Sequence, residues 1–166
     1  ENIQNKVPVK NILEIPEIRI KLEERREKQE YLGEIISENT QIIDRLAIAR
    51  LENLKVRSNG YHVTAIAGKE CDACLVIHGD IGAGFDEEGS YPLSASFYTN
   101  SFIHKSGGVF DLTKLATRFD NDGGGHANAC GCRIKSINNG AVVEQYVTEE
   151  DIQKNIDEWI NMWSQR

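Results

Sequence analysis

The chain has 166 residues and a formal net charge of −7, and its longest apolar run, residues 73–77, is far too short to cross a bilayer. This length suits one domain with a core, or one domain plus a helical arm, and excludes two full domains. Residues 1–55 hold 11 acidic and 10 basic side chains, whereas residues 56–166 hold 15 acidic and 9 basic ones. Because long nucleic acids are held by many Lys and Arg contacts to phosphate, the acidic second part favours a short oligonucleotide or a mononucleotide.

The ends of the sequence bear on what kind of chain this is. It begins with Glu1, and its one methionine is Met162, so we expect a piece of a longer protein. The polar N-terminus has no signal-peptide pattern. We expect a soluble, cytoplasmic protein without a membrane partner.

A helix is predicted over residues 16–52. Pro16 suits a first helical turn, and Glu17 and Lys21 form an opposite-charge pair four residues apart. Residues 23–30 are polar on every face, which is typical of a solvated connector. We therefore expect residues 1–52 to be a helical connector from a preceding domain that this chain lacks.

A sheet domain is predicted over residues 53–166. Asn59-Gly60 predicts a hairpin turn before an alternating strand at 61–66, and the apolar runs at 74–77 and 93–98 predict two more strands, with a mobile loop at 79–90 between them.

The rest of this domain mixes both kinds of element. A short helix is predicted at 111–119, a second hairpin around 138–140, and a final helix starting near Thr148. Strands interrupted by helices predict an α/β fold with a mixed β-sheet and flanking helices.

The run Gly123-Gly124-Gly125-His126 is the most informative motif in the chain. Glycines lack a β-carbon, so their backbone amides can turn toward one ligand, and phosphate is the ligand that suits such a pocket best. A helix beginning near Ala127 would add its positive dipole end to the same site. His126 would supply a hydrogen-bond donor or an aromatic face, and we prefer this interpretation to a purely structural histidine.

Three segments in order, residues 93–99, 111–116 and 123–131, resemble the DHH-associated domain, which is the C-terminal half of the DHH-family phosphoesterases. The resemblance implies that a preceding domain binds two divalent metals, typically manganese, and hydrolyses phosphodiester bonds, while the associated domain binds the nucleotide. The substrate-binding residues implied here are Gly123, Gly124, Gly125 and His126, with a hydroxyl from Ser96 or Thr99.

Two departures from the family pattern affect this site. The family often has an arginine near the strand end that holds Ser96 and Thr99, and this strand has none. Either the phosphate is held more weakly, or Tyr98 replaces the arginine by stacking on a base. Asp120 and Asp122 stand where relatives run almost directly into the glycines; we expect them to point to solvent, the alternatives being a loop cap or a cation that bridges to phosphate.

No catalytic or metal-binding residues are predicted within the chain. An Asp-His-His sequence is absent, and the four histidines are scattered. Cysteines 71, 74, 130 and 132 are expected to be free thiols, although four thiols are also enough for a structural zinc.

Three functions remain open at this point. We favour the nucleotide-binding domain of a metal-dependent phosphodiesterase acting on short oligonucleotides or cyclic nucleotides, with the missing catalytic domain as its partner. The alternatives are a non-catalytic nucleotide-binding regulatory module and a zinc-stabilised interaction domain. Whether the chain is an enzyme, and whether it forms a homodimer, stay open.

Overall fold

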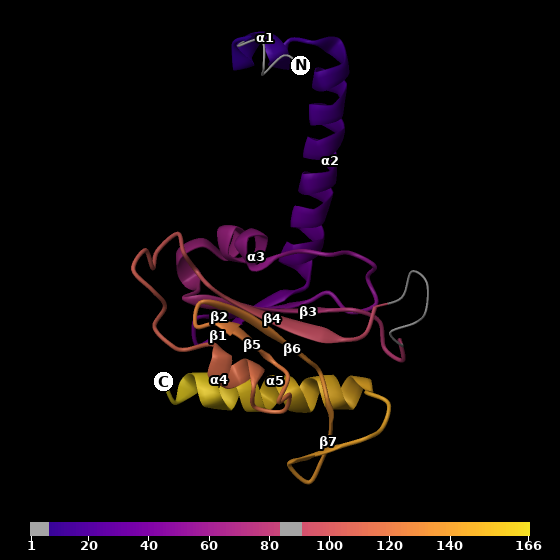
Figure 1. The fold of residues 1–166 in the computed structure, drawn as a ribbon, viewed down its shortest axis with the longest axis vertical. Coiled ribbons are helices and arrows are strands. Elements are labelled where there is room, and N and C mark those ends of the chain that lie inside the picture. Colours follow the sequence, from indigo (N-terminus) through magenta and orange to yellow (C-terminus); the bar gives the residue numbers. More distant parts are fainter. Residues whose placement is uncertain (1–6, 84–90) are drawn as a thin grey trace. The chain divides into compact units, whose positions relative to one another are not determined.

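The computed structural model describes residues 7–83 and 91–166, and the chain divides into two compact units, residues 1–35 and 36–166 (Figure 1). Residues 84–90 of the predicted 79–90 loop lie outside the described residues. Among the helices described, none joins the length and the apolar character that a bilayer span needs.

The first unit is helical. It contains α1 (Val9–Leu13) and most of α2 (Pro16–Glu38), whose last residues belong to the second unit. Ile36 is the only buried side chain among the residues of α2, and Ile20 is 57% exposed. The predicted polar helix is therefore confirmed from residue 16 to residue 38.

The prediction that this helix continues to residue 52 is wrong. Residues 40–50 form the hairpin of β1 (Thr40–Ile43) and β2 (Leu46–Arg50). Its two-residue turn has φ of 45° at Asp44 and 65° at Arg45, the left-handed values that a tight hairpin turn requires. The Trp163 indole donates to the Asp44 carbonyl at 2.8 Å. A tertiary contact therefore supports a turn that the local sequence does not predict.

The predicted hairpin at Asn59-Gly60 is also wrong. Asn59 caps α3 (Gly60–Ala67), because its side chain accepts from the Tyr61 and His62 amides. The residues predicted as an alternating strand thus form a helix, which ends in a 3-10 turn at Gly68–Glu70.

Six strands form the main sheet, in the order β1-β2-β3-β4-β6-β5. β3 (Ala73–His78) is parallel to β2, and every other neighbouring pair is antiparallel: β3 with β4 (Ser94–Thr99), β4 with β6 (Ala129–Arg133), and β6 with β5 (Gly124–His126). This confirms the predicted mixed α/β sheet and the strands predicted at 74–77 and 93–98.

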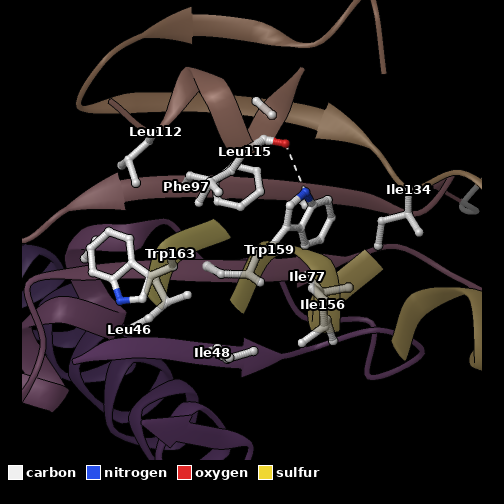
Figure 2. Close-up of a cluster of buried hydrophobic side chains, with 14 of the residues drawn as sticks. Leu46, Ile48, Ile77, Phe97, Leu112, Leu115, Ile134, Ile156, Trp159 and Trp163 are labelled. Carbon is white, nitrogen blue, oxygen red and sulfur yellow. Dashed lines mark hydrogen bonds between the residues drawn. The ribbon is translucent and has the colours of Figure 1, made fainter. Parts of the chain in front are cut away.

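Helices cover the two faces of the sheet unequally (Figure 1). α4 (Thr113–Ala116) and α5 (Glu149–Ser164) pack on one face, which we call the α5 face, and α3 packs on the other, the α3 face. On the α5 face, Phe97 meets Trp159 edge to face at 5.1 Å, and the Trp159 indole donates to the Leu115 carbonyl at 2.9 Å (Figure 2). This buried cluster fixes the sheet that carries the candidate site.

The C-terminal predictions are largely confirmed. Thr148 and Asp151 form a capping box at the start of α5. The second hairpin consists of β7 (Ser136–Asn138) and β8 (Ala141–Val143) around a turn at Asn139 and Gly140. Residues 132 and 133 belong to β6 of the main sheet, so the hairpin itself begins at Ser136.

Candidate functional site

The register of β3, β4, β6 and β5 aligns side chains in rows across the α3 face. Because side chains alternate along a strand, every second residue shares this face. The first row is Cys74, Tyr98, Ala129 and His126; the second is Val76, Ser96, Gly131 and Gly124; the third is His78, Ser94 and Arg133. α3 packs chiefly on β2, β3 and β4. The rows therefore bring His126, Ser96 and Gly124 to one face of the sheet.

The three glycines have different roles. A β-carbon on Gly123 would collide with the Ala116 carbonyl, and one on Gly125 would lie 2.7 Å from the Ala129 carbonyl oxygen. At Gly124 a β-carbon would meet nothing within 4 Å, although its φ of 150° is one that only glycine adopts readily. Packing thus requires the outer two glycines, and the middle one is open on the α3 face.

The expected phosphate loop is an edge strand instead. Gly124 and Gly125 belong to β5, and the Gly123 amide already donates to the Asp120 carbonyl at 2.9 Å. Successive amides of a strand point to opposite sides, so these three amides do not converge on one ligand atom. The helix expected to begin near Ala127 is also wrong, because Ala127 and Asn128 form the tight turn between β5 and β6.

His126 is exposed at the end of β5, and the adjoining turn is held firmly in place. The Asn128 side-chain carbonyl accepts from the Thr99 hydroxyl at 3.0 Å and from the Gly108 amide at 2.8 Å. Asn128 was not singled out from the sequence, because its partners lie in distant segments. It positions the turn beside His126.

Ser96 and Thr99 lie on opposite faces of β4. Ser96 is on the α3 face, whereas Thr99 is on the α5 face, 8% exposed, and its hydroxyl donates to Asn128. The two hydroxyls therefore do not meet in one site. Ser96 is the one that shares a face with His126.

A cavity of about 680 Å³ opens beside Ser96, lined by Ser94, Ala95, Ser96, Asp120, Asp122, Gly131, Cys132, Arg133 and Lys135. A β-carbon on Gly131 would lie 3.0 Å from the Ala95 carbonyl oxygen and 3.7 Å from the Ser96 hydroxyl, so glycine leaves more space beside that hydroxyl. Arg133 stands opposite Ser94 in the register. The sequence of β4 alone does not reveal this arginine, because Arg133 lies on β6 and is placed beside β4 by strand pairing.

Asp120 and Asp122, which precede the glycines, have different environments. Asp120 is 3% exposed, accepts from the Arg133 amide at 2.7 Å and pairs with the Lys135 ammonium at 3.1 Å. Burial opposes its ionisation, but these two partners outweigh burial and lower its pKa. The expectation that both aspartates point to solvent is thus wrong for Asp120, which braces β6, whereas Asp122 is exposed.

Tyr98 is held against α3. A β-carbon at Gly60 would overlap the Tyr98 ring, so only glycine lets the helix approach this closely. Tyr61 lies 6.3 Å from it, centroid to centroid. Burial raises the pKa of the Tyr98 hydroxyl, which keeps the ring neutral at physiological pH. The sheet register places Tyr98 opposite Ala129, which in turn pairs with His126.

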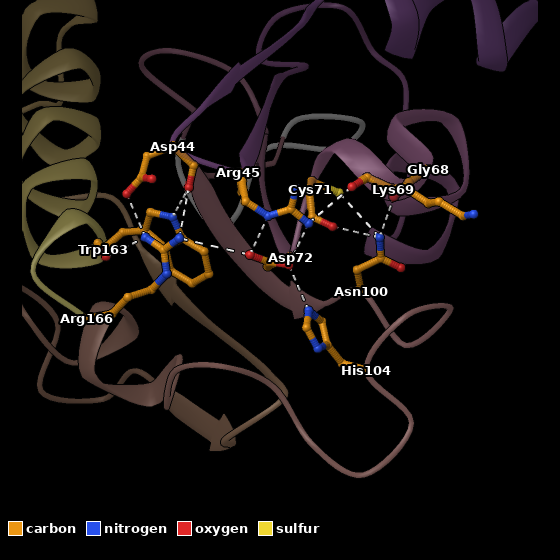
Figure 3. Close-up of polar contacts among 10 residues, drawn as sticks. All are labelled: Asp44, Arg45, Gly68, Lys69, Cys71, Asp72, Asn100, His104, Trp163 and Arg166. Carbon is orange, nitrogen blue, oxygen red and sulfur yellow. Dashed lines mark hydrogen bonds and ion pairs between the residues drawn. The ribbon is translucent and has the colours of Figure 1, made fainter.

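A second polar cluster lies where β3 begins (Figure 3). Arg45 binds both carboxylate oxygens of Asp72 at 2.8 Å, and His104 reaches the same carboxylate at 2.9 Å. The Arg45 guanidinium is the main cause that lowers the pKa of Asp72 to about 2. Arg166 bonds to the Asp44 carboxylate at 2.6 Å. These mutual pairings make the cluster an anchor for the β1–β2 turn and the 100–104 segment.

The site residues do not form a metal centre. Cys74 faces α3, whereas Cys130 and Cys132 face α5, so the four cysteines do not surround one ion, and the geometry does not support a zinc site. Across residues 7–83 and 91–166, no three His, Cys, Asp or Glu side chains gather as metal ligands would. The metal pair that the DHH resemblance implies therefore has no fitting ligand set in the described part of this chain.

Comparisons with known proteins agree with this fold. The chain is similar to the pGpG-specific phosphodiesterase PggH from Vibrio cholerae, with a TM-score of 0.64 and 19% identity over 92% of this chain and 44% of that one. It is also similar to an exopolyphosphatase-related protein from Bacteroides fragilis, with a TM-score of 0.52 and 17% identity over 81% of this chain and 34% of that one. No protein-family model and no curated protein sequence matches the chain. The chain spans less than half the length of these two proteins, and what it shares with them is the fold.

Proposed function

We propose that residues 36–166 bind the substrate of a DHH-family phosphoesterase, a nucleotide or short oligonucleotide. The metals, expected to be manganese, and the hydrolytic residues would lie in a domain outside this chain. Support comes from the DHH-associated sequence pattern and from the fold shared with part of a pGpG-specific phosphodiesterase. The observation that carries the proposal is the row arrangement, in which the Tyr98 ring, the Ser96 hydroxyl, two glycines and His126 lie on one face.

The base would lie over Ala129, between Tyr98 and His126. These two side chains are two strands apart, so their Cα atoms are separated by about 10 Å at the usual strand spacing. One aromatic ring fits between them with contacts of about 3.5 Å on each side. The small Ala129 side chain leaves that space open, and stacking requires no particular base.

The phosphate would lie one row along, near Ser96. The Ser96 hydroxyl donates to it, Arg133 supplies positive charge from the next row, and Gly124 and Gly131 let it approach the backbone. Arg133 takes the role of the arginine that β4 itself lacks. Base and phosphate then occupy neighbouring rows, about 7 Å apart along the strands.

The test is a titration of the parent chain and of His126→Ala with GMP and with pGpG. Loss of one stacking surface is expected to weaken binding about 5- to 100-fold with little change in melting temperature. The matched control is His62→Ala, which removes an exposed histidine from α3. Equal affinity of His126→Ala and the parent removes His126 from the site.

A second pair of variants separates stacking from hydrogen bonding at Tyr98. Tyr98→Phe keeps the ring and is expected to bind as the parent does, whereas Tyr98→Leu is expected to weaken binding as much as His126→Ala. If both variants bind like the parent, the base does not lie on this ring.

A further inference from the structure

A second cavity, of about 340 Å³, lies at the carboxyl ends of the parallel strands β2 and β3. Its lining comes from the two loops that follow these strands and from the segment before β4: Leu51, Lys55, Val56, Arg57, Gly79, Asp80 and Tyr91. In open α/β sheets, ligands bind in the crevice outside the carboxyl ends of the parallel strands. This cavity occupies that place.

Its charge favours an anion. Among the described residues that line it, Lys55 and Arg57 face one acid, Asp80, and neither cation forms an ion pair with a carboxylate in residues 7–83 or 91–166. The Arg57 guanidinium lies 3.5 Å from the centroid of the Tyr91 ring. Stacking fixes the plane of the guanidinium and leaves its N–H edge to bind an oxyanion in a forked geometry.

A half-buried histidine, His78, is next to the cavity lining in the sequence. His78 immediately precedes the lining residue Gly79, and within the described chain its Nδ1 is buried without a hydrogen-bond partner. Burial lowers the pKa of His78, and the nearby Arg57 charge lowers it further. A buried nitrogen without a partner is costly, and such groups are commonly satisfied by a bound ligand or water.

The first loop is held in an unusual conformation. Asn53 and Lys55 have φ of 60° and 54°, left-handed values that are uncommon outside glycine. The Asn53 side chain accepts from the Ile81 amide at 2.9 Å, which ties the two loops together. Strain of this kind persists where the surrounding structure enforces it, and it clusters at ligand sites.

We propose that this cavity binds a phosphoryl group, held by Arg57 and Lys55. The group belongs either to the oligonucleotide of the α3 face or to a separate nucleotide. The row of His78, Ser94 and Arg133 runs from the cavity toward the first site, which gives an oligonucleotide a continuous path. The arrangement of Lys55 and Arg57 does not depend on the proposed function. Only the assignment of the phosphoryl group to an oligonucleotide rests on that function.

The experiment follows backbone amide NMR shifts of the whole chain during titration with inorganic phosphate. Saturable shifts are expected at Val56 and Gly79 in the parent and in His126→Ala, and they are expected to weaken about tenfold or more in Arg57→Gln. Arg57→Lys, which keeps the charge, retains part of the binding. The matched control is Lys114→Gln, which removes another cation that lies over a ring, at 5.6 Å from Phe110. Absence of saturable shifts in the parent, or equal shifts in Arg57→Gln, overturns the proposal.

Titration with GMP and pGpG separates the two sources. If one oligonucleotide spans both sites, pGpG binds more tightly than GMP, and Arg57→Gln removes that advantage. If a separate nucleotide fills the cavity, Arg57→Gln leaves the shifts around His126 unchanged. Either result supports the phosphoryl site once the phosphate titration is positive. If the proposed function is wrong, His126→Ala binds nucleotide with the same affinity as the parent.

Discussion

Alanine at Gly125 and at Gly124 tests whether the glycine run is an edge strand with one open position. Both residues have positive φ, so either alanine is strained by about 1–3 kcal/mol. At Gly125 the new β-carbon also meets backbone, 2.7 Å from the Ala129 oxygen and 2.9 Å from the Cys130 Cα. Strand pairing holds those atoms, which adds about 1–3 kcal/mol of overpacking. Gly125→Ala is therefore expected to be less stable than Gly124→Ala by about 1–3 kcal/mol, the free energy of overpacking.

Urea unfolding followed by tryptophan fluorescence measures this difference directly. Both tryptophans, Trp159 and Trp163, lie on α5, so the signal reports the unit that carries the site. For a chain of this size, 1 kcal/mol corresponds to roughly 2–4 °C in melting temperature, which gives a second readout.

Ligand binding completes the comparison of the two glycines. Gly124→Ala is expected to lose nucleotide affinity while it remains folded, because its methyl group would project from the α3 face. If Gly125→Ala is as stable as Gly124→Ala, the packing derived for β5 is refuted. If Gly124→Ala binds nucleotide like the parent, the ligand does not approach the backbone at that glycine.

Two further predictions concern the scaffold. The pKa of Asp72 is lowered from 3.8 to about 2, so its pairing with Arg45 and His104 contributes about 2 kcal/mol above pH 4, and this contribution is lost as the pH falls toward 2. In urea unfolding between pH 2 and 6, the stability difference between the parent and Asp72→Asn is expected to vanish at the acid end; a difference that does not change with pH contradicts this. Trp159→Phe removes the hydrogen bond to the Leu115 carbonyl and part of a buried ring, and is expected to cost about 2–4 kcal/mol in urea unfolding, whereas a cost below about 1 kcal/mol would argue against the packing of Figure 2.

Elements with strong local signals were predicted correctly. The apolar runs of β3 and β4, the Asn139-Gly140 turn and the Thr148 capping box each carry their structural preference within a few residues. The polar helix was also predicted correctly as far as residue 38, because its structural preference is local.

The wrong predictions share one cause, which is ambiguity over a short window. Asn59-Gly60 suits a hairpin turn and a helix N-cap equally well, and packing of Gly60 on Tyr98 selects the helix. Residues 40–50 have apolar spacing that fits a helix, and pairing of β2 with β3 makes them strands. The Asp44–Arg45 turn depends on Trp163 and on Asp72, far away in the chain.

The sequence by itself determined the fold class and the motif that marks the candidate site, because the glycine run, His126 and Ser96 can be recognised without knowing what they touch. Only the tertiary structure decided how those residues are used. Strand register placed Ser96 and His126 on one face, turned Thr99 to the other, and brought Arg133 to the strand that lacks an arginine. Register depends on hydrogen bonds between segments remote in sequence, and a shift of one residue would reverse every one of these assignments.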